Sequence, residues 1–129
     1  MVHRDLHTGN ILFDYPKNKS DLYICISDMG SCGKLGNIDE KNIYGVLPYV
    51  APEVLRGKPY TQASDIYSFG MIMYFVATLR QPFINVAHDH FLTLDICNGI
   101  RPEINESEAT KDYIDLMKRC WDSNPDNRP

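Results

Sequence analysis

The chain has 129 residues, of which 43% are hydrophobic and 23% are charged, and its formal net charge is -4. This length and composition suit one folded domain and exclude a long disordered tail. The acidic balance provides no basic surface for contacts with a phosphate backbone, so we expect no nucleic-acid partner.

The cysteines and the hydrophobic runs indicate where such a protein resides. The four cysteines lack Cys-x-x-Cys spacing and any dense disulfide pattern, which favours a reducing, cytoplasmic setting. The longest uncharged run, residues 66–79, is shorter than the roughly 20 residues that a membrane span needs. The start, Met1-Val-His-Arg-Asp5, places charges where a signal peptide would begin its apolar region. We therefore expect a soluble, intracellular protein without a membrane span.

The first half of the chain predicts a hairpin and then a long loop. Two apolar runs, 11–13 and 22–26, flank the polar, proline-containing segment 14–21, which is typical of a β-hairpin. Residues 30–48 contain glycines at 30, 33, 36 and 45 and follow neither a helical nor a strand period. Loops of this length in compact domains are usually functional.

The second half predicts three helices. The first has its interior at 66–79, with Ser64 as the capping residue and Pro82 as the stop, and its apolar character on nearly every face places it in the core. The second, around 91–97, ends at a favourable Asn98-Gly99 terminus. In the third, the inward-facing stripe consists of Tyr113, Leu116, Met117 and Cys120. The predicted fold class is mainly α with a small β-hairpin.

Three motifs follow one another along the chain. His3-Arg-Asp-Leu-His-Thr-Gly-Asn10 matches the pattern H-R-D-L-x-x-x-N and precedes an apolar strand. Asp28-Met-Gly30 stands where D-F-G is expected, and Ala51-Pro-Glu53 supplies A-P-E. In this order they resemble the eukaryotic-type protein kinase catalytic domain, and the segments 99–104 and 120–129 are closest to its tyrosine-kinase-like group.

The resemblance implies the C-terminal lobe of a protein kinase over residues 1–129. Its parts are the catalytic loop 3–10, the metal-binding turn 28–30, the activation segment 28–53 and the helical subdomain 62–129. The sequence has no Gly-rich loop, strand lysine or helix glutamate of an ATP-clamping lobe, and the family continues into further helix. We therefore expect a domain fragment, incomplete at both ends, whose 129 residues alone are inactive.

The resemblance also implies roles in phosphoryl transfer, a reaction that depends on positioning and on neutralising phosphate charge. Asp5 corresponds to the residue that orients the substrate hydroxyl and accepts its proton, and Arg4 precedes it. Asn10 and Asp28 correspond to the ligands that hold Mg²⁺ on ATP, because oxygen atoms are the ligands that this ion prefers. Leu12 corresponds to the apolar floor beneath the adenine. The expected cofactors are ATP and Mg²⁺.

Other matching residues are structural by resemblance. His3 belongs to the first of the three motifs and Gly30 to the second. Asp65 corresponds to the carboxylate that accepts hydrogen bonds from the backbone around the first motif. Glu53 and Arg128 correspond to an ion pair, which we expect to be buried. The implied partners are a protein substrate and regulatory proteins.

The sequence departs from the family beside Asp5. Serine/threonine kinases usually have lysine two residues later and tyrosine kinases an Ala-Ala-Arg or Arg-Ala-Ala block, whereas this chain has His7-Thr8-Gly9. Val46 replaces a threonine that usually bonds this lysine. A rebuilt polar contact and the decay of an inactive kinase both fit these changes. We expect a partly protonated His7 to take over some of the lysine's phosphate-facing role.

Three function classes follow. In the first, the complete domain transfers the γ-phosphate of ATP to serine or threonine, or to tyrosine, of protein substrates. In the second, the protein is a catalytically inactive kinase-like module that binds proteins through the activation segment and residues 91–99. In the third, only the fold is kept, as a scaffold without a nucleotide role.

Overall fold

A computed structural model of the chain describes residues 1–14, 23–27 and 46–129. The expected metal-binding turn at 28–30 lies outside the described residues, as does the expected activation segment up to residue 45. The predicted fold class is confirmed, because the described part is mostly helical and contains one two-stranded antiparallel sheet.

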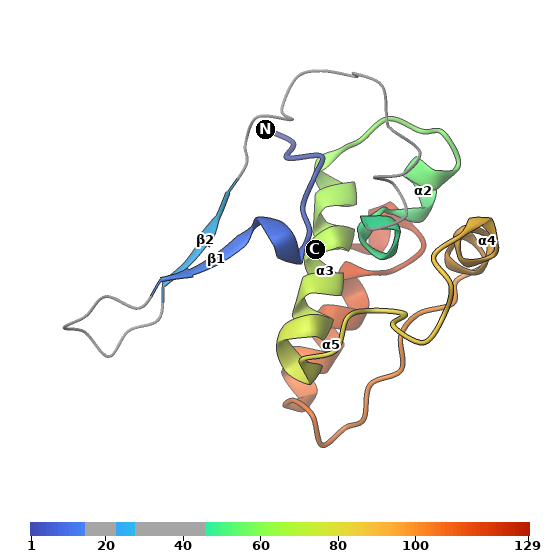
Figure 1. Cartoon of the computed structure of the whole chain (residues 1–129). Helices are drawn as coiled ribbons and strands as arrows, with labels where there is room; N and C mark the ends of the chain where they lie inside the picture. Colours follow the sequence, from blue (N-terminus) through green and yellow to red (C-terminus); the bar gives the residue numbers. More distant parts are fainter. Residues whose placement is uncertain (15–22, 28–45) are drawn as a thin grey trace.

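Helix α3, Gln62–Thr78, runs through the middle of the molecule (Figure 1). Tyr67 and Met71 on this helix are fully buried. Helix α5, Lys111–Cys120, packs along α3. A Cβ atom at Gly70 would lie 2.9 Å from the Cβ of Cys120, so only glycine allows this close approach of the two helices. The predicted central position of the apolar helix is therefore confirmed.

The predicted ends of α3 are wrong. The N-cap is Thr61, whose side chain accepts from the Ser64 N–H, while the Ser64 hydroxyl accepts from the Thr61 N–H at 2.8 Å. Both residue types favour N-caps, and this reciprocal capping box places Ser64 in the first turn. The helix ends at Thr78, before Leu79 with a φ of 55°, so Pro82 lies beyond the end and does not stop it.

Helix α4, His90–Cys97, begins at the N-cap Asp89 and buries Leu92 and Ile96. The chain leaves it through Gly99, whose φ of 94° confirms the left-handed terminus. On α5 the inward face differs from the prediction, because Leu116 is 41% exposed and Ile114 is buried. Each residue turns a helix by about 100°, so the stripe that includes 113, 114, 117 and 120 leaves position 116 outside.

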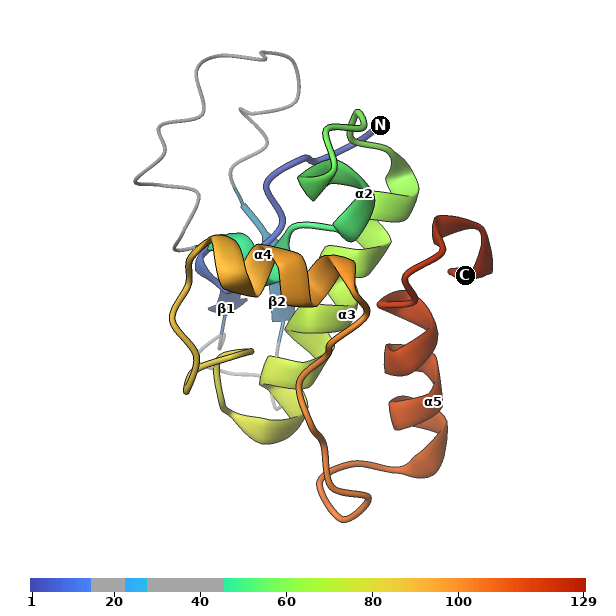
Figure 2. The same ribbon diagram turned by 90° about the vertical axis from the view of Figure 1, so that its right-hand side faces the viewer.

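The hairpin pairs β1, Ile11–Asp14, with β2, Tyr23–Ile26, in a register that places Ile11 opposite Ile26. It lies on one side of α3, and α4 lies on the opposite side (Figures 1 and 2). The hairpin side chains of Leu12, Ile24 and Ile26 are each more than half exposed.

Short helical elements complete the described chain. Helix α2, Pro52–Leu55, begins within the third motif, and 3-10 turns occupy Thr8–Asn10, Leu47–Tyr49 and Pro125–Asn127. The predicted irregular loop at 30–48 therefore ends in a helical turn. Among the described residues, no helix has both the length and the apolar character that crossing a bilayer requires.

Candidate active site

The first motif is anchored to the beginning of the central helix. Asp65, in the first turn of α3, accepts hydrogen bonds from the backbone N–H of His3 at 2.6 Å and of Arg4 at 3.0 Å. Arg4 has a φ of 69°, a left-handed conformation that costs about 1 to 3 kcal/mol in a residue with a side chain. The two hydrogen bonds offset this strain and fix the backbone that leads into Asp5.

The imidazole of His3 joins this loop to the end of the hairpin. Its Nε2 lies 3.2 Å from the carbonyl oxygen of Ser27, and its Nδ1 lies 3.4 Å from the backbone nitrogen of Asp5. Because Nδ1 accepts from an N–H, the proton belongs on Nε2, which donates to Ser27. Ser27 immediately precedes Asp28, which lies outside the described residues together with Gly30.

Asn10 is buried and holds its amide against Asp5. Its Nδ2 donates to the Asp5 carbonyl oxygen at 2.8 Å and to the Asp5 Oδ2 at 3.3 Å. The backbone N–H of Ser27 donates to the Asn10 carbonyl oxygen at 2.8 Å. Within the described part of the chain, Asn10 Oδ1 receives no hydrogen bond. The structure thus brings Asp5 and Asn10 together, and no described residue donates to the Asn10 amide oxygen.

These oxygens fit a magnesium ion chemically, because Mg²⁺ takes carboxylate and amide oxygens as ligands. Asn10 offers Oδ1, and the expected second ligand, Asp28, follows directly on a residue that is hydrogen-bonded to Asn10. Leu12 lies on the exposed hairpin, 53% exposed, and is not among the residues that line the hollow beside Asp5.

A hydroxyl network beside the loop was not predicted. The buried Tyr49 donates through its hydroxyl to Gln81 Oε1 at 2.6 Å, and the same hydroxyl lies 3.2 Å from Thr8 Oγ1. Burial raises the pKa of Tyr49, and the hydrogen bond with Thr8 opposes this rise. Ser68 of α3 donates to the Tyr49 carbonyl oxygen at 2.7 Å. No sequence signal links these residues, since they are far apart along the chain.

The hollow beside Asp5 is lined by residues that include Arg4, Asp5, Val46 and Tyr60. Burial raises the pKa of Tyr60, and the charges of Asp5 and Asp65 raise it further. The hollow therefore places one carboxylate, Asp5, and one guanidinium, Arg4, beside the apolar side chain of Val46. Within the part of the chain that the structure describes, the Arg4 guanidinium has no hydrogen-bond partner or carboxylate within ion-pair distance.

Glu53 and Arg128 form a buried ion pair. Arg128 Nη1 lies 2.7 Å from Glu53 Oε1, and Nη2 lies 2.9 Å from Oε2. Burial opposes ionisation of Glu53, but the hydrogen bonds and charge of Arg128 outweigh it and lower the pKa of this carboxyl. Guanidinium carbons of Arg101 and Arg128 lie 5.1 and 5.3 Å from the ring centre of Tyr67. Burial raises the pKa of Tyr67 far above its ordinary value.

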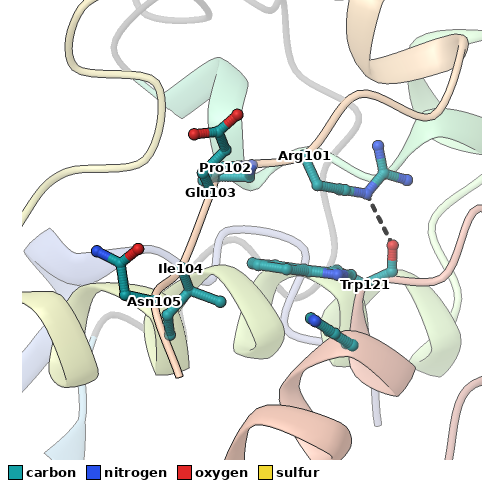
Figure 3. Close-up of a pocket in the computed structure, with 7 residues that line it drawn as sticks. Arg101, Pro102, Glu103, Ile104, Asn105 and Trp121 are labelled. Carbon is teal, nitrogen blue, oxygen red and sulfur yellow. Dashed lines mark hydrogen bonds between the residues drawn. The ribbon is translucent and has the colours of Figure 1, made fainter. Parts of the chain in front are cut away.

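Arg101 is a second structural arginine that sequence reasoning missed. It donates to the carbonyl oxygens of Trp121 at 2.9 Å and of Ile96 at 3.0 Å, and so joins the ends of α4 and α5. Figure 3 shows its hydrogen bond to Trp121 at the edge of an open pocket of about 480 Å³. This pocket shares no lining residue with the hollow beside Asp5.

Comparisons with known proteins identify the family to which the chain is similar. The family model described as protein kinase domain matches residues 1–129. The chain is 36% identical over 133 residues to a protein of Acanthamoeba polyphaga mimivirus named as a serine/threonine-protein kinase/receptor, covering 100% of the chain and 7% of that protein. It is 34% identical over 139 residues to the dual specificity protein kinase splA of Dictyostelium discoideum, covering 100% of the chain and 6% of that protein.

A human relative, the receptor-interacting serine/threonine-protein kinase 1, is 32% identical over 149 residues, covering 100% of the chain and 21% of that protein. The chain thus spans only 7%, 6% and 21% of the length of these three relatives.

Proposed function

The chain belongs to the protein kinase family, and on this premise we propose that the protein carrying it transfers the γ-phosphate of ATP to serine or threonine side chains of protein substrates. The observation that carries the proposal is the Asp5 carboxylate, which is partly exposed while Asn10 and the anchored loop hold it in place. The names of two of the relatives above specify serine and threonine, and the third relative is a dual specificity kinase.

We propose that Asp5 is the group that meets the substrate hydroxyl. Its carboxylate would orient the hydroxyl and accept its proton while the hydroxyl oxygen bonds to the γ-phosphorus of ATP and the bond from this phosphorus to ADP breaks. The anchoring of His3 and Arg4 on Asp65 supports this role, since a general base must be held within hydrogen-bond reach of its proton. We also propose that Arg4 belongs to this site, because its positive charge lies next to Asp5 in the same loop.

Asn10 and Asp28 are proposed as the residues that would hold Mg²⁺. The chemistry supplied by this ion when bound is neutralisation of charge on the phosphate oxygens of ATP. The Asn10 Oδ1, to which no residue of the described ranges donates, supports its assignment. The hydrogen bonds from Ser27 to the Asn10 carbonyl oxygen support a common site for Asn10 and the residue after Ser27. Leu12 is proposed to lie beneath the adenine, and its exposed position on the hairpin is compatible with a ligand there.

We further propose the boundaries that the motifs imply, with the catalytic loop at 3–10, the metal-binding turn at 28–30, the activation segment at 28–53 and the helical subdomain at 62–129. The proposed setting is the cytoplasm, with protein substrates and regulatory proteins as partners. The described cysteines Cys25, Cys97 and Cys120 are free thiols, which supports a reducing compartment.

The proposal is tested by incubating the full-length protein with γ-labelled ATP, Mg²⁺ and casein, and then identifying the labelled amino acids in the product. Phosphoserine or phosphothreonine is expected. Label on tyrosine alone would contradict the proposed specificity. An absence of label above that of the Asp5→Asn variant would contradict phosphoryl transfer and favour the protein-binding alternative.

A further inference from the structure

The imidazole of His7 contacts three groups of the catalytic loop. Its Nδ1 accepts a hydrogen bond from the Gly9 N–H at 3.0 Å. Its Nε2 lies 3.5 Å from Asp5 Oδ1 and 3.1 Å from Asn10 Nδ2. The side chain of His7 is only 22% exposed, so these contacts and the neighbouring Tyr49 ring confine it.

The hydrogen-bond donors and acceptors determine where the imidazole proton resides. A neutral imidazole carries one N–H, and an accepting Nδ1 places it on Nε2. The two protons of Asn10 Nδ2 point to Asp5 oxygens, namely the carbonyl and Oδ2. The His7 Nε2–H is then directed toward Asp5 Oδ1, 3.5 Å away, and the 3.1 Å between His7 Nε2 and Asn10 Nδ2 separates two donors that face the same carboxylate. In this arrangement each carboxylate oxygen of Asp5 faces one N–H donor, whereas the opposite tautomer would turn a lone pair toward the carboxylate.

The position of the His7 ring leaves no room for a side chain at residue 9. A Cβ atom at residue 9 would lie 2.8 Å from His7 Cε1 and 2.9 Å from His7 Nδ1, closer than real Cβ contacts come. The backbone of Gly9 does not have a positive φ, so alanine would suffer no backbone strain there. A methyl group at this position would therefore act on the imidazole alone.

We propose that His7 is a positioning residue for Asp5, which it holds through Nε2–H while the Gly9 N–H fixes the tautomer and the ring plane. The inference rests on the proposed function. It adds that His7 holds the Asp5 carboxylate at its Oδ1 atom. It also differs from the expected phosphate-facing role of His7. Because the Gly9 N–H donates to Nδ1, the ring is held with Nε2 facing Asp5.

The test compares variants of the full-length protein in the casein assay. His7→Phe keeps a ring but removes Nε2–H, whereas the side-chain amide of His7→Gln can place an N–H near the same point. We expect kcat to fall on the order of 10- to 100-fold in His7→Phe, with the KM for ATP nearly unchanged, and to recover in His7→Gln. Equal kcat values in His7→Phe and His7→Gln would overturn the positioning role.

A second arm uses the contact between Gly9 and the imidazole. Gly9→Ala should lower kcat in the wild-type background and have little effect in a His7→Ala background, where no ring meets the methyl group. Melting temperatures of all variants check that the fold is intact. Additive effects of the two changes would overturn the inference while leaving the proposed function in place. A wild-type protein that labels casein no better than Asp5→Asn would overturn both.

Discussion

Arg128 and Glu53 are 75 positions apart in the chain and meet through two parallel hydrogen bonds of 2.7 and 2.9 Å. Arg128 also donates to the carbonyl oxygens of Ala63 at 2.8 Å and of Asp122 at 3.0 Å. A single guanidinium thus connects α2, the start of α3 and the segment after α5. The pair expected from the motifs is present in the structure, and its side chains are almost fully buried.

Substitution of either partner should destabilise the protein strongly. Arg128→Ala leaves Glu53 as an uncompensated buried carboxylate, and such changes typically lower the free energy of unfolding by about 3 to 5 kcal/mol. Arg128→Lys should recover little, because an ammonium group cannot make the paired contact. Urea denaturation measures the effect, with the exposed Arg119→Ala as the control. A loss in Arg128→Ala no greater than in Arg119→Ala would refute the structural role.

The same pair predicts how stability depends on pH. The pKa of Glu53 is lowered in the folded state, so its contribution is complete above the ordinary glutamate pKa of about 4.3 and disappears as the pH falls through the folded value. The difference in unfolding free energy between wild type and Glu53→Gln should therefore be largest near neutral pH and shrink in acid. Denaturation curves across this range check it. A difference that stays constant with pH would contradict the lowered pKa.

Asp65→Asn should disturb the catalytic loop. The carboxylate accepts from both His3 and Arg4, whereas asparagine offers one oxygen and turns an N–H₂ group toward the second donor. Loss of a hydrogen bond to a charged group costs about 1.5 to 3 kcal/mol, and the left-handed Arg4 loses a support. We expect a lower melting temperature and a lower kcat.

The matched control is Asp112→Asn, which removes an exposed carboxylate from the first turn of α5. If both variants behave alike in the melting and kinetic assays, then the role of Asp65 is only that of a charge near a helix end.

Thr61→Ala should weaken the beginning of the central helix. It removes the side chain that caps the Ser64 N–H, and loss of an N-cap costs about 0.5 to 2 kcal/mol. Thr61→Ser should be close to wild type, and Gln62→Ala, at an exposed neighbouring position, serves as the control. Chemical denaturation gives the comparison. Wild-type stability in Thr61→Ala would mean that the capping box contributes nothing.

Much of the fold was predictable because it depends on local patterns. The hairpin follows from two apolar runs around a polar segment, and the buried helix follows from a long apolar run without a charge. The cap of α3 was not predictable, because Thr61 and Ser64 are both capping residue types and only the backbone geometry distinguishes N-cap from N3. Leu116 was misplaced because positions 113, 116, 117 and 120 and the true stripe through Ile114 both satisfy helical spacing.

The candidate site was also predictable only in part. Asp5 and Asn10 could be assigned to the candidate site because they match the kinase pattern H-R-D-L-x-x-x-N. The network of Thr8, Tyr49 and Gln81 arises from tertiary packing between segments with no common pattern. The direction of the His7 ring depends on a backbone N–H two residues away, which a sequence motif does not encode.

We propose that phosphoryl transfer by this protein depends on the Asp5 carboxylate, and the most direct measurement is kcat for label transfer from ATP to casein by full-length wild type and Asp5→Asn. Loss of a general base typically costs about 100- to 10,000-fold, so the variant should fall by at least about 100-fold at an unchanged melting temperature. The control Asp115→Asn, on the exposed face of α5, should match wild type. A folded Asp5→Asn variant that keeps wild-type kcat would contradict the proposed role of Asp5.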